Sequence, residues 1–224
     1  EIGCGWGALA DMAANDMGAE VVGLTLSDEQ LAWAQQRLAN TPNASRTDLR
    51  LQDYRSPDVT KNHLGEHQLF DAVCSIEMIE AVGQSYWPTY FQTIAASLRD
   101  GGKACIQAIV IRDELFERYI QGTDFIQQYV FPGGCLPSPA KFTAQAQAAG
   151  LEVTDSLAFG LDYANTLAQW RATFAQQEEG VRALGFDTAF IRTWEFYLCY
   201  CEAAFLEGNT DVVQFTLRKP SQAH

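Results

Sequence analysis

Short apolar runs and segments of helical periodicity alternate through the first half of the chain. Residues 20–26 and 70–76 are nearly continuous apolar runs, as in strands that are covered on both faces. Residues 47–54 alternate between apolar and polar positions, and residues 101–111 begin with a Gly-Gly turn before an apolar run. The helical patterns lie between these strands, over residues 27–40 and 86–98. This alternation predicts an α/β fold whose parallel strands are joined by crossover helices.

The pattern changes after residue 111. Residues 112–148 are rich in aromatic residues, contain the stretch FPGGCLPSP and predict a helical insertion. Residues 151–160 predict a sixth strand, and residues 211–219 alternate cleanly and predict a final, antiparallel strand. Amphipathic helices are predicted between these two strands. Since no repeat, low-complexity segment or linker divides the chain, we interpret residues 1–224 as one domain.

The composition and the net charge exclude several classes of protein. With 47% hydrophobic and 19% charged residues, the 224-residue chain is globular. A net charge of −13 argues against nucleic-acid binding and against docking on anionic lipid by charge alone, and leaves hydrophobic membrane contact open. The six cysteines match no zinc or redox spacing, so we expect reduced thiols of a cytosolic protein. No apolar run is long enough to span a bilayer.

The chain opens with EIGCGWG, in which Gly3, Gly5 and Gly7 alternate with larger residues. Glycine lacks the Cβ atom that keeps a ligand away from the backbone, and N–H groups at the start of a helix bind polar ligands. The spacing differs from the GxGxxG of dinucleotide-binding folds and lacks the lysine of a P-loop. Taken alone, the stretch fits a tight turn that packs a helix on a strand equally well.

Polar residues also follow the next two predicted strands. GLTLSDEQ ends the strand at 20–26, and LQDY ends the strand at 47–54. Ligands of open parallel sheets bind in the crevice beyond the carboxyl ends of the strands. Three successive strand ends with polar groups therefore favour a cofactor site at this edge. The stretch SDEQ also fits a helix start with Ser27 as the N-cap, and the two roles are compatible.

Taken in order, the motifs of the chain resemble those of the cyclopropane-fatty-acyl-phospholipid synthase family, which includes the mycolic acid cyclopropane synthases. They are EIGCGWG, GLTLSDEQ, LQDYR, SIEMIEAVG, YWPTYF, YVFPGGCLPS, FGLDYANTLAQW and WEFYLCYCEAAF. The first alone indicates a class I methyltransferase, whereas FPGGCLPS together with FGLDYANTL is far more specific.

The resemblance implies a Rossmann-like class I methyltransferase fold. Its sheet is mostly parallel with helices on both faces, its last strand is antiparallel, and residues 112–148 form a substrate-side insertion after the fifth strand. The family also has a segment and most of a first strand ahead of the position of Glu1, so we expect this chain to be N-terminally truncated.

The family binds S-adenosylmethionine, and the resemblance places the binding residues on this chain. Gly3, Gly5 and Gly7 would line the methionine and ribose end of the cofactor, with Glu1 as the acidic position of the motif. The other implied contacts are Thr25, Leu26 and Gln30 at the ribose, Asp53 and Tyr54 at the adenine, and Ile76. Gln30 and Asp53 are also explained as surface polar residues. The three scattered histidines make a metal site unexpected.

The family transfers an activated methyl group to the cis double bond of a phospholipid acyl chain and so forms a cyclopropane fatty acid. An alkene is a poor nucleophile, so such an enzyme must align it, exclude water and stabilise a carbocation with aromatic rings. A base then removes a proton, and the resemblance implies that this base is a bound bicarbonate ion. The implied ligands are Glu80, Tyr163, the backbone of Ile109, and Gln107, which stands where the family has a histidine.

Some positions depart from the family pattern. A neutral Gln107 would hold bicarbonate less tightly, or it marks a relative that makes methyl-branched or methylene products. Glu77 occupies a position where a small residue is usual. It either places a second carboxylate near Glu80, which would raise one pKa, or it is a solvated loop residue. Tyr163 by itself fits a buried core tyrosine with a structural hydrogen bond. We expect the family's upstream cysteine to be missing because the chain starts after that position, and Cys4 cannot replace it because it belongs to the glycine motif.

Three functions stay open from the sequence. The leading one is a lipid-modifying methyltransferase, and the others are a small-molecule methyltransferase and a degenerate lipid- or cofactor-binding protein. For the first we expect an unsaturated phospholipid acyl chain as substrate, no nucleic acid, and a cytoplasmic protein that contacts the inner face of the membrane peripherally. A homodimer is left open.

Overall fold

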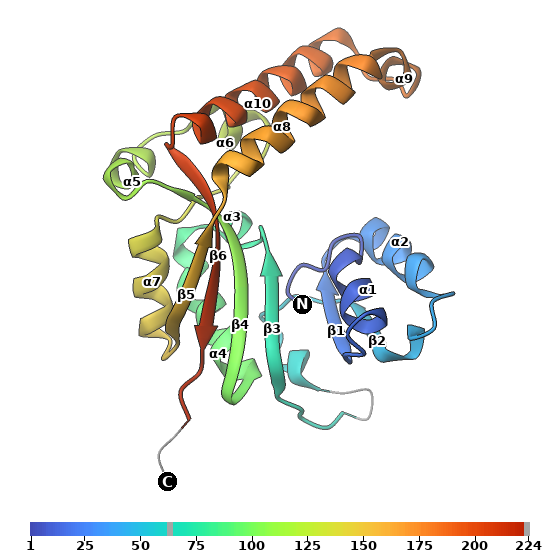
Figure 1. Ribbon diagram of the computed structural model, residues 1–224, viewed down its shortest axis with the longest axis vertical. Helices are drawn as coiled ribbons and strands as arrows, with labels where there is room; N and C mark the ends of the chain where they lie inside the picture. The colour runs from blue at the N-terminus through green and yellow to red at the C-terminus, as the bar shows by residue number, and fades with distance from the viewer. Residues whose placement is uncertain (62–64, 222–224) are drawn as a thin grey trace.

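The computed structural model describes residues 1–61 and 65–221 (Figure 1). The strands are β1 (Val21–Thr25), β2 (Thr47–Leu51), β3 (Phe70–Ile76), β4 (Leu98–Ile111), β5 (Glu152–Ala158) and β6 (Thr210–Arg218). The helices are α1 (Ala8–Asn15), α2 (Asp28–Leu38), α3 (Ile79–Val82), α4 (Trp87–Ser97), α5 (Asp113–Tyr119), α6 (Phe125–Tyr129), α7 (Pro139–Ala148), α8 (Gly160–Gln176), α9 (Glu178–Ala183) and α10 (Thr188–Leu206). Short 3₁₀ turns cover Ala44–Arg46, Pro57–Thr60 and Gln84–Tyr86.

The strands form a mixed sheet. β1 pairs with β2 in parallel, and β3 pairs with β4 in parallel. β6 lies between β4 and β5 and runs antiparallel to both, as the arrows in Figure 1 show. The predicted α/β class and the antiparallel last strand are therefore confirmed.

The first two residues join the two halves of the sheet. The Ile2 N–H donates to the Cys74 carbonyl of β3 at 2.8 Å, and the Leu24 N–H of β1 donates to the Glu1 carbonyl at 3.0 Å. The Ser75 hydroxyl adds a buried hydrogen bond to the Ile2 carbonyl at 2.9 Å. The spatial order is thus β2, β1, residues 1–2, β3, β4, β6, β5, which brings the carboxyl ends of the parallel strands to one edge.

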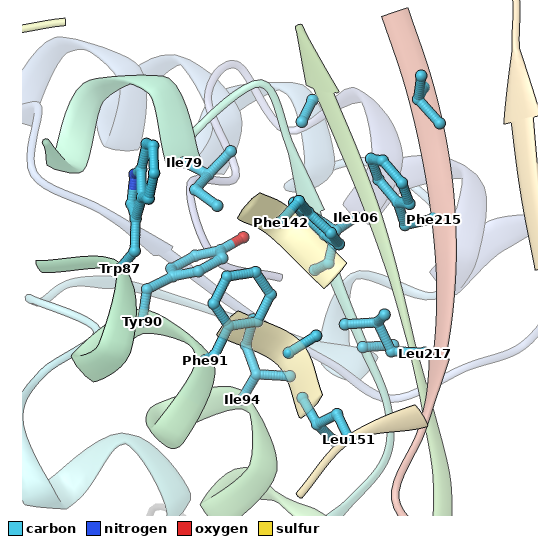
Figure 2. Packing of buried hydrophobic residues seen from close by; sticks show 14 of the residues in the cluster. Ile79, Trp87, Tyr90, Phe91, Ile94, Ile106, Phe142, Leu151, Phe215 and Leu217 are labelled. Atoms are coloured by element: carbon cyan, nitrogen blue, oxygen red, sulfur yellow. The ribbon is translucent and has the colours of Figure 1, made fainter. Parts of the chain in front are cut away.

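One face of β4 and β6 carries the main core (Figure 2). Ile106 and Phe215 point from these strands toward α4 and α7, and Phe142 of α7 is fully buried against them. The Phe142 ring stacks on Phe215 with 3.9 Å between centroids and meets Phe91 of α4 edge-on at 4.9 Å. This aromatic packing holds the helical layer on the sheet.

The opposite face of the same strands is covered by α8 and α10 at the carboxyl end of β4, which is the amino end of β6. Val212 of β6 is buried there with Leu167 and Leu198, and Ile109 of β4 packs against this second cluster. Figure 1 shows α8 and α10 lying along each other as an arm that extends beyond the sheet, with α9 at its far end. Helices therefore cover parts of both faces, as the sequence predicted.

Several element boundaries differ from the prediction. β2 ends at Leu51, so Asp53 and Tyr54 lie in the loop after the strand. β4 begins at Leu98, ahead of the Gly-Gly turn. Within residues 112–148, α6 contacts α10 through the rings of Phe125 and Phe196, whereas α5 buries Phe116 in the main core and α7 packs on the sheet. Ser27 caps α2 as predicted, since its hydroxyl accepts the Gln30 N–H at 3.2 Å.

A groove of about 340 Å³ lies between α1, β1 and β3. Its lining is mostly apolar and includes Leu9, Val21, Phe70 and Val73.

No helix in the described residues is long and apolar enough to cross a bilayer. All six cysteines are free thiols.

The aromatic layer yields a prediction about stability. We expect Phe142→Ala to lower the free energy of unfolding by about 3–5 kcal/mol, because a fully buried ring leaves a cavity. Phe142→Leu should cost clearly less, since leucine refills most of the space. Urea unfolding followed by circular dichroism measures both. Equal, small losses in the two variants would contradict the packing described here.

Candidate functional site

The predicted cofactor residues gather at the carboxyl edge of the sheet. The Gln52 N–H donates to the Thr25 carbonyl at 3.0 Å and so holds the end of β2 beside the end of β1. Residues 1–2 place the glycine turn between the ends of β1 and β3, and Ile76 is the last residue of β3. The fold therefore brings the three strand ends singled out in the sequence to one edge.

Each of the three glycines in the turn meets a different structural requirement. All have positive φ, 81° at Gly3, 51° at Gly5 and 79° at Gly7, a region that other residues rarely adopt. A Cβ at Gly7 would lie 2.8 Å from the Cβ of Ala34, so Gly7 lets α1 and α2 pack closely. A Cβ at Gly3 would meet the Met78 side chain at 3.0 Å, whereas at Gly5 it would meet nothing within 4 Å. Gly5 is thus the glycine that presents open backbone.

The residues at the end of β1 are partly engaged with one another. The Thr25 hydroxyl is buried and donates to the Gln30 Oε1 at 2.8 Å. This bond turns the Gln30 side chain back toward the strand end and leaves its NH₂ group as a donor. Leu26, by contrast, is 72% exposed. Thr25 therefore acts as a support for Gln30.

Asp53 and Tyr54 lie in the loop after β2. The guanidinium of Arg55 pairs with the Asp53 carboxylate and holds its pKa below the usual range. The Tyr54 ring packs edge-on against Tyr90 at 5.8 Å, and its hydroxyl is buried without a hydrogen-bond partner in the described residues. Burial raises the pKa of the Tyr54 hydroxyl. Glu1 likewise has a buried carboxylate oxygen without a described partner.

Glu80 and Ile109 are in direct contact. The Ile109 N–H of β4 donates to Oε1 of Glu80, and Oε2 of Glu80 is buried without a hydrogen-bond partner in the described part of the chain. Burial raises the pKa of Glu80 to about 7, against the opposing effect of backbone hydrogen bonds, and the nearby Glu77 charge adds to the rise. The protonated form of this carboxyl therefore persists to higher pH than in a free glutamate.

A second carboxylate, Glu77, connects Tyr163 with Gln107. The Tyr163 hydroxyl donates to Glu77 Oε2 at 2.9 Å, and Gln107 Nε2 donates to Glu77 Oε1 at 2.7 Å. Gln214 Nε2 of β6 donates to the Gln107 Oε1 at 2.9 Å and fixes the orientation of that amide. Burial, and then Glu77, raise the pKa of Tyr163, so its hydroxyl stays protonated and donates. Glu77 is therefore part of this network, and a solvated loop position is the wrong interpretation of it.

Two of the sequence motifs hold this cluster in place. In FGLDYANTL, the Gly160 N–H donates to Asp211 Oδ1 at 2.7 Å, and a Cβ at Gly160 would lie 2.6 Å from that oxygen. The start of α8, and with it Tyr163, is thereby fixed to β6. In FPGGCLPS, the Cys135 N–H donates to the Glu80 carbonyl at 2.8 Å, which fastens the loop over α3. Both motifs act by positioning site residues.

Two residues of this cluster, Asp211 and Gln214, are not predicted by the sequence motifs. Both lie in the last strand, where Gln214 is paired with Gln107 and Asp211 with Val110. A glutamine within an alternating apolar strand is a signal of a polar contact. Which residue it meets depends on the register between β4 and β6, which local sequence does not show.

Known proteins provide an independent comparison. The sequence profile described as mycolic acid cyclopropane synthetase matches residues 1–215. The chain is 43% identical over 220 residues to the "Tuberculostearic acid methyltransferase UfaA1" of Mycobacterium tuberculosis. It is 32% identical over 205 residues to the "Cyclopropane-fatty-acyl-phospholipid synthase" of Escherichia coli. These matches cover 97% and 92% of this chain and 49% of the length of each relative.

A solved structure supports the same assignment. The mycolic acid cyclopropane synthase CmaA1, complexed with SAH and CTAB, superimposes with a TM-score of 0.84 at 29% identity. The superposition covers 97% of this chain and 76% of that protein. The chain spans about half the length of the curated relatives it matches. By the profile that spans residues 1–215 and by this fold, the chain belongs to the mycolic acid cyclopropane synthetase family.

Proposed function

We propose that this chain carries the catalytic site of an S-adenosylmethionine-dependent methyltransferase that acts on the cis double bond of an unsaturated phospholipid acyl chain. The observation that carries the proposal is that two hydrogen-bonded groups meet at β4: Glu80 with the Ile109 N–H, and Tyr163 with Gln107 through Glu77. Half-buried carboxylates beside a carboxyl-edge glycine turn suit proton removal next to a bound cofactor.

The chain's residues fit S-adenosylmethionine. Gly5 offers open backbone, and Gln30 is held by Thr25 with its NH₂ group as a donor for a ribose hydroxyl. Glu1 and Tyr54 each have a buried polar oxygen without a described partner, as expected where a polar ligand completes the site. Asp53 and Ile76 are also predicted to contact the cofactor at the carboxyl edge of the sheet. When bound, the cofactor supplies an electrophilic methyl group.

The product depends on where the positive charge lies when the added methyl group loses a proton. Loss of the proton while the charge is on the neighbouring carbon closes the ring and gives the cyclopropane, which is the first candidate. Loss of the proton after a 1,2-hydride shift has moved the charge to the methylated carbon gives a methylene product. A saturated methyl branch needs a hydride in addition. The 43% identity to a relative named tuberculostearic acid methyltransferase supports a non-ring product as the second candidate.

Bicarbonate as the bound base stays a prediction. The expected ligands are present in Glu80, Tyr163 and the Ile109 backbone. The N–H of Ile109 donates to Glu80, and the Tyr163 and Gln107 donors are directed at Glu77. An external anion would therefore have to share or displace these hydrogen bonds.

Peripheral membrane contact is proposed through the arm formed by α8 and α10. Large apolar side chains are exposed along it and at its tip: Leu161, Trp170, Leu184, Phe186, Phe196 and Leu206. With a net charge of −13, attraction to anionic lipid is unfavourable, so contact with the bilayer would be apolar. This fits a cytoplasmic protein that meets the inner face of the membrane.

The cofactor assignment predicts the effect of one substitution. Gly5→Val in the full-length gene product should abolish S-adenosylmethionine binding, because a branched side chain fills the open backbone face. Gly18→Val is the matched control. Gly18 also has positive φ and open space, but it precedes β1 at the opposite edge of the sheet. Calorimetry measures both affinities. Unchanged binding by Gly5→Val, or equal loss in both variants, would overturn the assignment.

The lipid assignment is tested with vesicles of unsaturated phospholipid and labelled cofactor. We expect labelled acyl chains that have gained one CH₂ unit, identified as cyclopropane or methylene by NMR. Raising the salt concentration should lower the rate only modestly, because screening weakens charge attraction and leaves apolar contact intact. Label on a small polar acceptor in place of the acyl chain would favour the small-molecule alternative, and cofactor binding without transfer would favour a binding protein.

The raised pKa of Glu80 predicts how stability depends on pH. The folded state holds this proton more tightly than the unfolded state, whose pKa is near 4.5. The resulting stabilisation is complete below pH 4.5 and is lost as the pH rises through about 7. Glu80→Gln cannot ionise, so its stability relative to the wild type should rise by about 2 kcal/mol between pH 5 and pH 8. Urea unfolding at the two pH values measures this. A constant difference would show that Glu80 ionises normally.

A further inference from the structure

Glu77 adopts a backbone conformation that carries a cost. Its φ is 52°, and it is the one non-glycine residue with positive φ among residues 1–61 and 65–221. Such a conformation costs of order 1 kcal/mol or more and persists only where the surroundings enforce it. Here the Glu77 N–H donates to the Gln107 carbonyl at 2.9 Å, directly after β3. Backbone and side chain of Glu77 are thus both bound to Gln107.

The carboxylate of Glu77 is held by donors from two further elements of the fold. Its two oxygens accept from Tyr163 of α8 and from Gln107 of β4, and Gln214 of β6 orients Gln107 in turn. Two donated hydrogen bonds, one to each oxygen, are the pattern that a carboxylate anion prefers. This fixed geometry is what a preorganised proton acceptor requires.

The same donors would otherwise hold an external anion. Tyr163 and Gln107 offer their protons to Glu77, and the remaining N–H of the cluster, that of Ile109, donates to Glu80. A second anion would also be repelled by the Glu77 charge, whose effect already reaches Glu80 and raises its pKa. The place of an external anion is therefore taken by a carboxylate of the chain itself.

We propose that Glu77 is the base that removes the proton after methyl transfer, and that it replaces a bound bicarbonate ion. The inference rests on the proposed function. With the substrate carrying one positive charge, a Glu77 oxygen takes a proton from the added methyl group. The C–H electron pair closes the new C–C bond and cancels the charge. Glu77 becomes a neutral carboxylic acid and returns the proton to water before the next turnover.

The test compares Glu77→Gln and Glu77→Gly in the full-length gene product. Glu77→Gln keeps the shape but cannot accept the proton, so the rate should fall about 100-fold or more. Glu77→Gly suits the positive φ and frees Tyr163 and Gln107, so its low rate should rise about 10-fold or more with added bicarbonate. The wild type should ignore bicarbonate. Glu179→Gln, an exposed carboxylate at the start of α9, is the matched control and should behave as the wild type.

A binding measurement separates this inference from the proposed function. Titration of bicarbonate in a calorimeter should give no binding to the wild type and measurable binding to Glu77→Gly, whatever the methyl acceptor is. Bicarbonate binding by the wild type, or a wild-type rate that depends on bicarbonate, would overturn the role of Glu77. So would an unchanged rate in Glu77→Gln. The wild type could prove inactive on lipid while bicarbonate binds to Glu77→Gly and not to the wild type. That result would overturn the assignment of a lipid substrate, and the inference that Glu77 takes the place of bicarbonate would stand.

Discussion

The two-residue alternation of β4 is the constraint on which the rest of the structure depends. Ala104, Ile106 and Ala108 are buried on one face, where α4 and α7 form the core. The intervening Gln107 and Ile109 thereby face the other side, where α8 and α10 close over the carboxyl end. A shift of one residue in this strand would bury Gln107 in the aromatic core and expose Ile106. Core and site are therefore fixed by the same register.

Two neighbouring carboxyl groups of the site lie in different surroundings. Glu80 is half-buried with its Oε2 enclosed, accepts a backbone N–H and has its pKa raised to about 7 by burial. Glu77 accepts two side-chain donors, one at each carboxylate oxygen. Burial disfavours the charge of Glu80, and the donors around Glu77 match the two acceptor oxygens of a carboxylate. The fold thus surrounds two carboxyl groups that are close in the sequence with different partners.

The motifs that make the family recognisable contribute mainly support. The glycine of FGLDY leaves room for Asp211, which fixes α8, and the FPGGC loop is fastened to the carbonyl of Glu80. Residues outside the Glu77 hydrogen-bond network therefore determine where Tyr163 and Glu80 lie. Errors of about an ångström in such positions are costly in catalysis, which explains why supporting contacts are as specific as the site itself.

The sequence by itself determined the order of strands and helices and the family, and it predicted a site at the carboxyl edge of the sheet. Alternation and apolar runs report which faces are buried, and turn residues report where strands end, so local pattern sufficed for β3, β6 and the Ser27 cap. Only the tertiary structure decided how the site residues meet. Gln107, Tyr163 and Gln214 come from β4, α8 and β6, Glu77 lies in the loop after β3, and single hydrogen bonds among them join residues as far as 107 apart along the chain. Their contact depends on strand register and on the angle of α8, and these are set by packing across the whole domain, which no local window of sequence contains.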